Sequence, residues 1–456
     1  MELASSVDDD SYWVGVNCSV LESFATRSTS PIQPAVGTGS ISKSIFFVGY
    51  SWHDGGDWRG FGNVGQPSAR RNGTSGNNAY FQYGDTGCDV SGVNKNNYLG
   101  RMMAFLVAAA ISFVVTGAIV KWGKFLGIID DPAKHKHPKV VHDKPVPRGG
   151  GIPIFAALLT ALVFAGTSKQ IWGIIAGAAV LAVTGFLDDR FEEKISPYFR
   201  LSINVLAAIL VIGTGIGIAY ITSPFGGVID LSWPRWCWGG HCIWLLSDIF
   251  ALVWLVWMQN IVGWSSGVDG QLPGFVIVAA VAMGILSQQF GDAGQWPVMA
   301  LAAIVAGAYA GFLPWNFYPQ RIIPGYGGKS LAGFLLGVLA IMSGAKVGAM
   351  LLVLSIPFVD AVLVIIKRLR EGRNPVWGGR EHLHHSLLDL GWGKRRIAVL
   401  YWVASAIMAW AALNLKAASK YFTMATVLVV LAGVILWLQK FSTWSKQPGR
   451  GSGSKT

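Results

Sequence analysis

The sequence predicts an all-α polytopic membrane protein with about 10 to 11 transmembrane helices and cytoplasmic catalytic loops, on three observations. Apolar residues make up 52% of the 456 residues, and charged residues only 13%. Apolar runs of about 17 to 25 residues, each long enough to cross a hydrocarbon core of about 30 Å as a helix, recur along the chain. Lys and Arg are concentrated in alternate loops. This balance is unlike that of an ordinary soluble domain.

The apolar runs define the expected spans. They lie at 103–127, 149–168, 170–187, 201–222, 246–262, 273–290, 297–315, 331–345, 347–366, 397–415 and 421–439. The adjacent pairs within 149–187 and 331–366 are the least sharply divided, because few polar residues separate their members.

The loops between these runs differ in charge. One set of alternate loops holds eighteen Lys and Arg residues, and the opposite set holds five. Because Lys and Arg are retained on the cytoplasmic side, the richer set and the C-terminal tail are predicted to be cytoplasmic. Much of the net charge of +12 therefore reflects how the chain is oriented in the membrane. A nucleic-acid surface is disfavoured, because the positive charges are dispersed between spans and lack interleaved stacking aromatics.

Residues 1–101 differ in composition from the predicted membrane domain at 102–440 and from the basic tail at 441–456. They are rich in Gly, Asn and Ser, with short aromatic runs such as FVGYSWHDGGDWRGFG. This pattern indicates either a small strand-and-turn module or a disordered tail. The start, MELASSVDDDSYW, lacks the basic and apolar regions of a signal peptide, although the charge rule places this segment outside. A real appendage and a mis-called start or fusion both stay open.

The four cysteines are few for this length. Cys237 and Cys242 lie together in WPRWCWGGHC on a predicted external loop, where a local disulfide and two free thiols are equally compatible with the sequence. No spacing of Cys and His indicates a zinc site.

The first predicted cytoplasmic loop contains HDKPVPRGGG. Its prolines hold the backbone extended, and its glycines permit close approach of a ligand. Lys144 and Arg148 in this setting suit an anion such as a phosphate. The alternative is a positively charged anchor that only fixes topology.

The run at 170–187 leads into GFLDDRFEEK. Two adjacent carboxylates at a membrane face, Asp188 and Asp189, are costly unless they pair, coordinate a cation or face water. A divalent cation such as Mg²⁺, with Mn²⁺ as a second candidate, binds carboxylates together with substrate phosphate oxygens. The alternative is helix-end electrostatics, with Arg190 and Lys194 as solvated partners.

Two further loops on the same predicted face hold candidate ligands. In NIVGWSSGVDGQLPG, Asp269 is a candidate third acidic group for the metal, and Asn260 at a helix end could bind a sugar, a base or a phosphate. In RIIPGYGGKS, Arg321 and the glycines could bind phosphate. The Gly-Lys-Ser does not form a P-loop, because no strand precedes it.

The last large loop contains GGREHLHHSLLDLGWGKRR. It places Arg380, His382, His384 and His385 among many other basic residues. A metal site is conceivable there, but a cationic neighbourhood disfavours a cation. Recognition of a phosphate by these histidines fits the surroundings better.

Five segments together resemble the polyprenyl-phosphate N-acetylhexosamine-1-phosphate transferases of glycosyltransferase family 4. They are DDP…HDKPVPRGGGIPIF, GFLDDRFEEK, GVDGQLPG, FLPWNFYP and GGREHLHHSLLDLGWGKRR, in the family's order and spacing within 102–440. The His-Leu-His-His form is more similar to the UDP-GlcNAc branch than to the phospho-MurNAc-pentapeptide translocase branch.

The resemblance implies an enzyme of the bacterial inner membrane. It would transfer a sugar-1-phosphate, with GlcNAc-1-phosphate as the first candidate, from a UDP-sugar to undecaprenyl phosphate and release UMP. The translocase-like reaction and a non-catalytic lipid-carrier binder are the alternatives, and a homodimer is left open. A transporter is disfavoured, because Asp360 is the clearest charge well inside a span and most others lie at cytoplasmic ends.

By position, the resemblance assigns Asp188 and Asp189 to the metal-associated or lipid-phosphate-activating pair and Asp269 to the nucleotide side. Roles in substrate binding fall on Lys144, Arg148, Asn260, Arg321, Arg380, His382, His384 and His385. Two expected carboxylates are absent, since Ser266 and Tyr326 stand at their positions, and Gly263 replaces an expected Asn. Either the three remaining acids hold Mg²⁺ with more water, or the chemistry is altered.

Overall fold

The computed structural model describes residues 50–53, 57–60, 90–133, 144–191, 195–223, 228–238, 241–288, 296–344, 347–374, 379–415 and 417–445. The chain divides into two compact units, Met1–Val93 and Asn94–Thr456. In the first unit, β1 (Tyr50–His53) pairs antiparallel with β2 (Asp57–Gly60). The predicted boundary at 101 lies inside the first long helix. The rest of the appendage, and residues 446–456 of the tail, lie outside the described residues.

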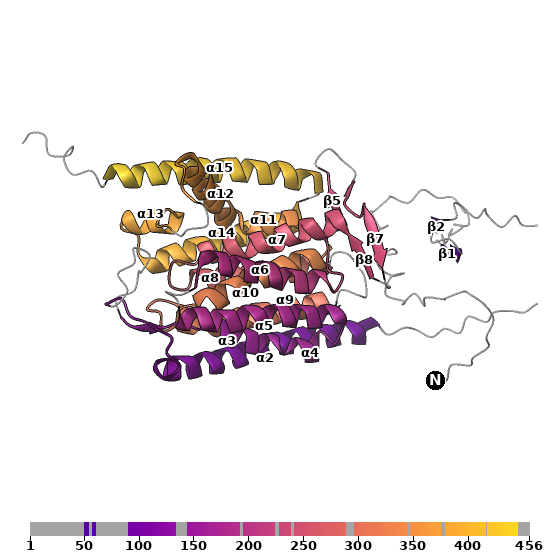
Figure 1. Cartoon of the computed structure of the whole chain (residues 1–456), viewed down its shortest axis with the longest axis horizontal. Coiled ribbons are helices and arrows are strands. Elements are labelled where there is room, and N and C mark those ends of the chain that lie inside the picture. Colours follow the sequence, from indigo (N-terminus) through magenta and orange to yellow (C-terminus); the bar gives the residue numbers. More distant parts are fainter. Residues whose placement is uncertain are drawn as a thin grey trace, which may run out of the picture. The chain divides into compact units, whose positions relative to one another are not determined.

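The second unit is a helical bundle (Figure 1). Its helices are α2 (Val90–Leu126, which begins in the first unit), α3 (Gly151–Leu158), α4 (Ala161–Phe164), α5 (Lys169–Arg190), α6 (Pro197–Ile212), α7 (Leu245–Trp264), α8 (Gln271–Gln288), α9 (Trp296–Asn316), α10 (Gly325–Met342), α11 (Val347–Val353), α12 (Ser355–Arg370), α13 (Leu383–Asp389), α14 (Lys394–Asn414) and α15 (Ala417–Ser445). The most extensive contacts join α8 to α9, α7 to α10, α8 to α14 and α5 to α10.

Half of these helices have the length and composition of membrane spans. Within the described residues, seven are long and apolar enough to cross a membrane, and α11 with α12 makes an eighth if this pair, bent by 86°, is one span. Gly151–Phe164 and Pro197–Ile212 are shorter apolar segments, and Phe422–Leu438 is a shorter apolar stretch within α15. The all-α membrane class is therefore confirmed, and each predicted apolar run corresponds to one of these helices or to a consecutive pair of them. Eleven full crossings stay a prediction, because in three runs the apolar helical stretch is shorter than expected.

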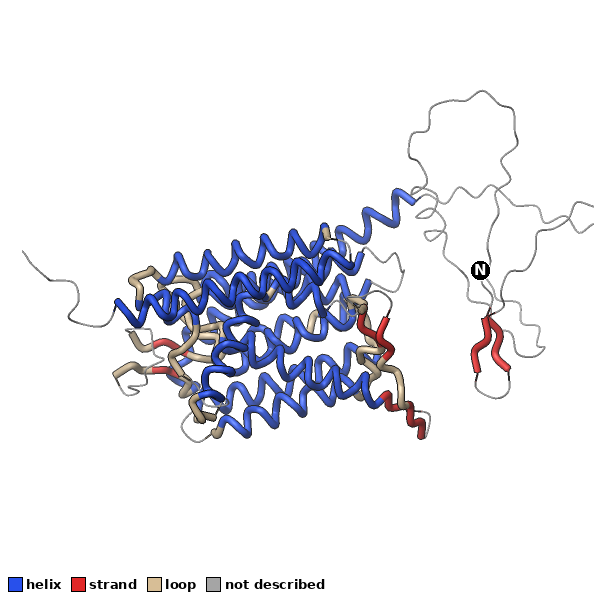
Figure 2. The backbone as a smooth tube through the Cα atoms, turned by 90° about the horizontal axis from the view of Figure 1, so that it is seen from above, coloured by secondary structure: helices blue, strands red, loops and turns tan. Residues whose placement is uncertain are grey.

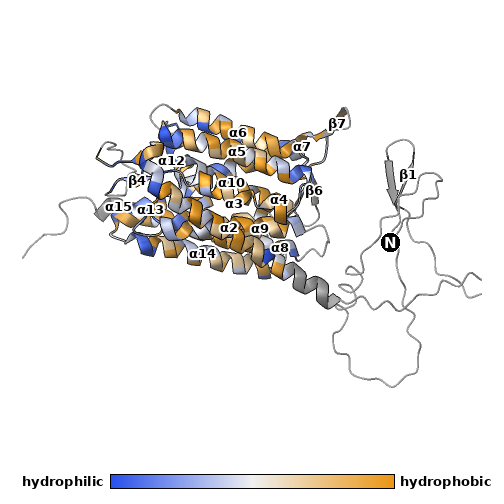
Figure 3. Cartoon of the chain, turned by 90° about the horizontal axis from the view of Figure 1, so that it is seen from below, coloured by the Kyte–Doolittle hydropathy of each residue, from blue (hydrophilic) through white to orange (hydrophobic). Residues whose placement is uncertain are grey.

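The two ends of the bundle differ, as Figure 2 shows. At one end, β3 (Ile129–Asp130) pairs with β4 (Val146–Pro147). At the other end, β5 (Tyr220–Thr222) pairs with β6 (Val228–Asp230), and β7 (Arg235–Trp238) pairs with β8 (His241–Trp244). We call the first the polar end; it comprises the described residues 127–133, 144–150, 265–270, 317–324 and 379–393. Hydrophilic residues gather there, near β4, α12 and α13 (Figure 3).

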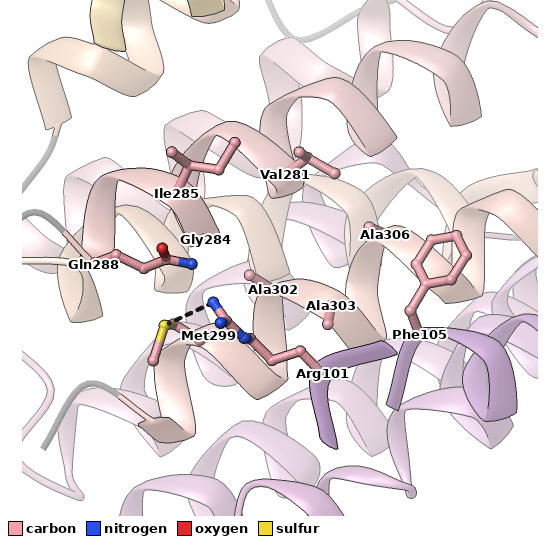
Figure 4. A pocket seen from close by; sticks show the side chains of 10 residues that line it. All are labelled: Arg101, Phe105, Val281, Gly284, Ile285, Gln288, Met299, Ala302, Ala303 and Ala306. Atoms are coloured by element: carbon pink, nitrogen blue, oxygen red, sulfur yellow. Dashed lines mark hydrogen bonds between the residues drawn. The ribbon is translucent and has the colours of Figure 1, made fainter. Parts of the chain in front are cut away.

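The opposite end holds two features outside the predicted site. Cys237 is disulfide-bonded, and it lies opposite Cys242 in the β7–β8 register, so the disulfide rather than a free thiol is present. A shallow hollow between α2, α8 and α9 is lined mainly by apolar side chains, with Arg101 Nη1 placed 3.4 Å from Met299 Sδ (Figure 4). None of the predicted site residues lines this hollow.

Helices α3, α5 and α10 meet backbone to backbone at the polar end. A methyl group on Gly185 of α5 would collide with Gly327 of α10, and one on Gly151 of α3 would lie 3.0 Å from the Gly327 Cα atom. Only glycine fits such a contact, because it lacks a Cβ atom. The Tyr309 hydroxyl of α9 also donates to the Gly328 carbonyl oxygen at 2.8 Å. The end of α5, which carries the two acidic residues, is thereby fixed against the start of α10.

Candidate functional site

The acidic pair lies in the last turn of α5 and is buried. Asp188 Oδ1 accepts a hydrogen bond of 2.6 Å from Nε of Arg200 on α6. Asp189 Oδ1 accepts a bond of 3.2 Å from the Tyr326 backbone N–H, whereas Asp189 Oδ2 is buried without a hydrogen-bond partner. The two carboxylates are therefore unequal. Asp188 is paired with a cation, and Asp189 keeps one oxygen available.

The positions of the two missing carboxylates are occupied by hydroxyls that bond within the protein. The Tyr326 hydroxyl lies 2.7 Å from Asn204 Oδ1 and 2.9 Å from the Arg200 carbonyl oxygen, so it can donate to either. The Ser266 hydroxyl donates to the carbonyl oxygen of Gly263 at 2.6 Å. Both groups stabilise the local fold, and neither restores the expected acid.

The first loop is fixed by an ion pair. Arg148 donates from Nε and Nη2 to Asp130 Oδ2 at 3.0 and 2.6 Å, and Asp130 is itself buried in β3. The charge of Arg148 also acts on Asp189, so this predicted phosphate ligand lies close to the acidic pair. Lys144, by contrast, is exposed.

Asp269 has surroundings of its own. Its Oδ1 lies 3.6 Å from the Lys394 ammonium, and its Oδ2 accepts a bond of 3.3 Å from the Gln320 backbone N–H. Among the described residues, no group of three or more His, Cys, Asp or Glu side chains is arranged to hold a metal ion. The predicted set of Asp188, Asp189 and Asp269 is thus not assembled, because separate cations hold two of its members.

The histidines lie at the start of α13 and are organised by a residue of α12. Asp360 is fully buried, and its two oxygens bind His382 Nδ1 at 2.9 Å and the Leu383 backbone N–H at 2.8 Å. The His382 and His384 rings stack with centroids 5.8 Å apart, and His385 adjoins His384 at 4.3 Å. The structure therefore brings the three predicted histidines together.

His384 is held in its neutral form. Burial, together with the positive charges of Lys329, Arg380 and its neighbouring histidines, keeps its pKa well below the usual value. Its Nδ1 is buried without a hydrogen-bond partner. A neutral imidazole offers one donor and one acceptor, so His384 can bind a polar group of a ligand at neutral pH.

An ion-pair cluster joins α12 to the segment before α13. Glu381 accepts from Arg368 at 2.7 Å, pairs with Arg373, and lies 3.9 Å from the Lys367 ammonium. Burial opposes ionisation of Glu381, but hydrogen bonds from Arg368 and Arg373 outweigh it and lower the pKa. This cluster orients the backbone that leads into the histidines.

Three predicted binding residues make contacts away from the acidic pair. The Asn260 amide donates to the Val256 carbonyl oxygen of its own helix at 2.7 Å. Arg321 is exposed and stacks over Trp315 at 5.8 Å. Arg380 pairs with Asp389 at 3.0 Å. Their assignment to substrate stays a prediction.

Comparison with known proteins connects this geometry to a family. The profile of glycosyl transferase family 4 matches residues 171–344, which include the acidic pair, Asp269 and the start of α10. This part of the chain, which carries the acidic pair, is therefore similar to glycosyl transferase family 4.

Curated relatives cover most of the bundle. A probable undecaprenyl-phosphate N-acetylglucosaminyl 1-phosphate transferase of Bacillus subtilis is 23% identical over 72% of this chain and 89% of its own length. A decaprenyl-phosphate N-acetylglucosaminephosphotransferase of Mycolicibacterium smegmatis is 27% identical over 67% of this chain and 80% of its own. A phospho-N-acetylmuramoyl-pentapeptide-transferase of Geobacillus kaustophilus is 26% identical over 67% of this chain and 96% of its own.

Four residues at the site carry no predicted role in the sequence. Arg200 and Asn204 lie one turn apart on α6, and Lys329 lies one turn after Tyr326 on α10. Asp360 lies within an apolar run. An available signal was the spacing of four between Arg200 and Asn204, which places both on one helix face. No local pattern reveals their partners, which come from other helices.

Proposed function

We propose that this chain transfers a sugar-1-phosphate, with GlcNAc-1-phosphate as the first candidate, from a UDP-sugar to undecaprenyl phosphate and releases UMP. The observation that carries the proposal is the gathering of two buried carboxylates, Arg148, Arg200 and three histidines at one end of an apolar bundle. The names of the Bacillus and Mycolicibacterium relatives support a phosphotransferase with a polyprenyl-phosphate acceptor.

The reaction joins two anions. An oxygen of the lipid phosphate bonds to the β-phosphorus of the donor, while the bond from that phosphorus to the bridging oxygen breaks and UMP leaves. Cationic side chains lower the repulsion and orient both phosphates. Because the acceptor's lipid chain stays in the bilayer, its phosphate must meet the water-soluble donor at a membrane face. The acidic pair lies at the end of an apolar helix, where such a meeting is expected.

The residues divide into two groups by chemistry. Arg148 and Arg200 lie beside the acidic pair, which suits them to the phosphate groups. The neutral His384 and its neighbours on α13 suit the uridine or sugar of the donor. A Mg²⁺ or Mn²⁺ ion held by three carboxylates does not fit the pairing of Asp188 with Arg200 and of Asp269 with Lys394. No step is therefore assigned to such an ion.

The proposal also includes the orientation of the chain in the membrane and the choice of donor. The basic loops indicate that the polar end and the C-terminus face the cytoplasm of a bacterial inner membrane. The Geobacillus relative favours a second candidate, the transfer of phospho-MurNAc-pentapeptide to the same acceptor. The His-Leu-His-His form and the names of the other two relatives favour the GlcNAc donor.

The test is to incubate the purified full-length protein with undecaprenyl phosphate and a panel of radiolabelled UDP-sugars, including UDP-GlcNAc and UDP-MurNAc-pentapeptide. We expect a sugar-linked lipid and an equal amount of UMP with UDP-GlcNAc. Asp189→Asn, in parallel, should lose both products. If no donor yields a sugar-linked lipid while undecaprenyl phosphate still binds, the chain is a lipid-carrier binder and not a transferase.

A further inference from the structure

The start of α10 places a lysine beside the acidic pair. The Tyr326 backbone N–H bonds to Asp189, and Gly325 lies so close that a methyl group there would collide with the Asp189 carboxylate. Lys329 follows Tyr326 by three residues, so both lie on one face of the helix. Lys329 is half-buried, and its charge acts on Asp189.

The same lysine also lies near the histidines. A Cβ atom added at Gly263 would be 3.8 Å from the Lys329 Cβ atom, which brings the end of α7 against this part of α10. Four residues later, a methyl group on Gly267 would collide with the His384 ring. The charge of Lys329 acts on His384 as well. Residues 263–267 thus connect the surroundings of Lys329 with those of His384, so Lys329 lies near both the acidic pair and the histidines.

Two buried polar atoms near Lys329 have no hydrogen-bond partner. They are Asp189 Oδ2 and His384 Nδ1, and their residues are only 7% and 1% exposed. Burying a polar group without a partner is unfavourable, so such atoms commonly indicate a ligand that completes the site. The charge of Lys329 acts on the residues of both atoms.

The charge balance of this region also differs from that of a carboxylate-held metal site. Tyr326 and Ser266 stand where two acids are expected, and Asp188 is neutralised by Arg200. Lys329, Arg148 and Arg200 instead supply positive charge around one available carboxylate oxygen. Each of these three side chains can donate charge-assisted hydrogen bonds to a diphosphate.

We infer that Lys329 binds the diphosphate of the nucleotide-sugar directly, and that donor binding therefore requires no divalent cation. The inference rests on the proposed function, because it assigns the donor to the same site. An ammonium serves as a point charge with three donors, which suits a phosphate that must be held without a rigid fork.

The experiment measures the affinity of UDP for the detergent-purified full-length protein by calorimetry, once with EDTA and once with excess MgCl₂. We expect the two dissociation constants to agree within about threefold, and Lys329→Met to weaken both by about 10- to 100-fold, the loss of one charge-assisted hydrogen bond. Lys124→Met is the matched control, since Lys124 is an exposed lysine at the C-terminal end of α2. Its affinity for UDP should equal that of the unaltered protein.

A reciprocal variant sharpens the test. Tyr326→Asp adds the expected carboxylate beside Asp189, so UDP affinity should fall about tenfold in EDTA and recover in MgCl₂. Thermal melting shows whether each variant is folded, and Lys329→Arg, which keeps the charge, should retain binding within about tenfold. Loss of UDP binding to the unaltered protein in EDTA, or equal binding by Lys329→Met, would overturn the inference.

The inference and the proposed function fail differently. Sugar-lipid formation that stops in EDTA, together with UDP binding that also stops, would leave the transferase proposal standing and overturn the role of Lys329. Metal-independent UDP binding with no sugar-linked lipid from any donor would do the reverse. Failure of UDP to bind under either condition would overturn the role of Lys329, whatever other reaction the protein catalyses.

Discussion

The carboxylates of Asp189 and Asp269 lie at the same end of the bundle but in different electrostatic surroundings. Asp189 accepts one backbone hydrogen bond and keeps its other oxygen without a partner. Asp269 Oδ2 accepts from the Gln320 backbone N–H, and its Oδ1, also without a hydrogen bond, faces the Lys394 ammonium at 3.6 Å. The comparison teaches that the partners of an acid, rather than its place in a motif, decide whether it can act on a substrate.

The largest expected effect comes from exchanging each acid for its amide. Asp189→Asn should lower the rate of UMP release by about 10²–10³-fold, because it removes the carboxylate oxygen that has no partner from the proposed site. Asp269→Asn should cost only about tenfold, since it weakens one partly buried ion pair. Rates from radiolabelled UDP-GlcNAc measure both. Equal losses would show that the two acids act as one unit.

A smaller effect is expected at the histidines. Asp360→Asn leaves His382 Nδ1 and the Leu383 N–H without their carboxylate, so kcat should fall by about 10- to 100-fold, as for other positioning partners of histidine. Asp389→Asn is the control, as Asp389 pairs with the exposed Arg380. A fall in thermal stability alone, with kcat unchanged, would refute the positioning role.

The next effect is on stability and comes from the close packing of α5 against α10. Gly185→Ala places a methyl group against Gly327 and should lower the free energy of unfolding by about 1–3 kcal/mol. Gly348→Ala in α11 is the matched control, because a Cβ atom there meets nothing within 4 Å. Thermal melting in detergent measures both variants. Equal melting temperatures would mean that α5 and α10 separate easily.

The smallest expected effect is a pH dependence of stability. His384 has a lowered pKa when folded, so below about pH 6.5 the unfolded chain binds a proton that the folded chain does not. Stability should therefore fall as the pH drops below about 6.5 and stay level above it. His384→Gln should flatten that slope. Unfolding followed from pH 5 to pH 8 measures the difference, and an unchanged slope would assign the titration to another group.

The fold class and the positions of the apolar helices could be predicted, because the hydropathy of each run depends only on its own residues. The 86° bend between α11 and α12 has a local cause that the continuous apolar run hides. Pro357 lies four residues after Val353, the last residue of α11, and cannot donate to its carbonyl oxygen. The shortness of α6 was also hidden. It ends at Ile212, before three residues that turn, although the apolar run continues to 222.

The site residues also divide into those that the sequence predicts and those that it does not. The acidic pair and the histidines stand out as unusual local clusters, and the structure brings each cluster together. Their partners could not be predicted, because Arg200, Asn204 and Asp360 belong to other helices and resemble ordinary residues of a basic loop or an apolar run. In the sequence, Lys329 stands out only as one of the basic loop residues that fix the orientation of the chain in the membrane. Its neighbours depend on the packing of α10 against α5 and α7.

The glycine contacts between α3, α5 and α10 have a mechanical consequence. Backbones in direct contact leave no side chain that can change rotamer, so this wall of the site is stiff. The opposite wall, α12 and α13, is joined through Glu381 and its arginines, one of which, Arg373, is exposed and open to screening by salt. The side of the site formed by α12 and α13 is therefore the more easily deformed one. A substrate that must displace part of the protein as it arrives will meet less resistance from the histidines than from the acidic pair.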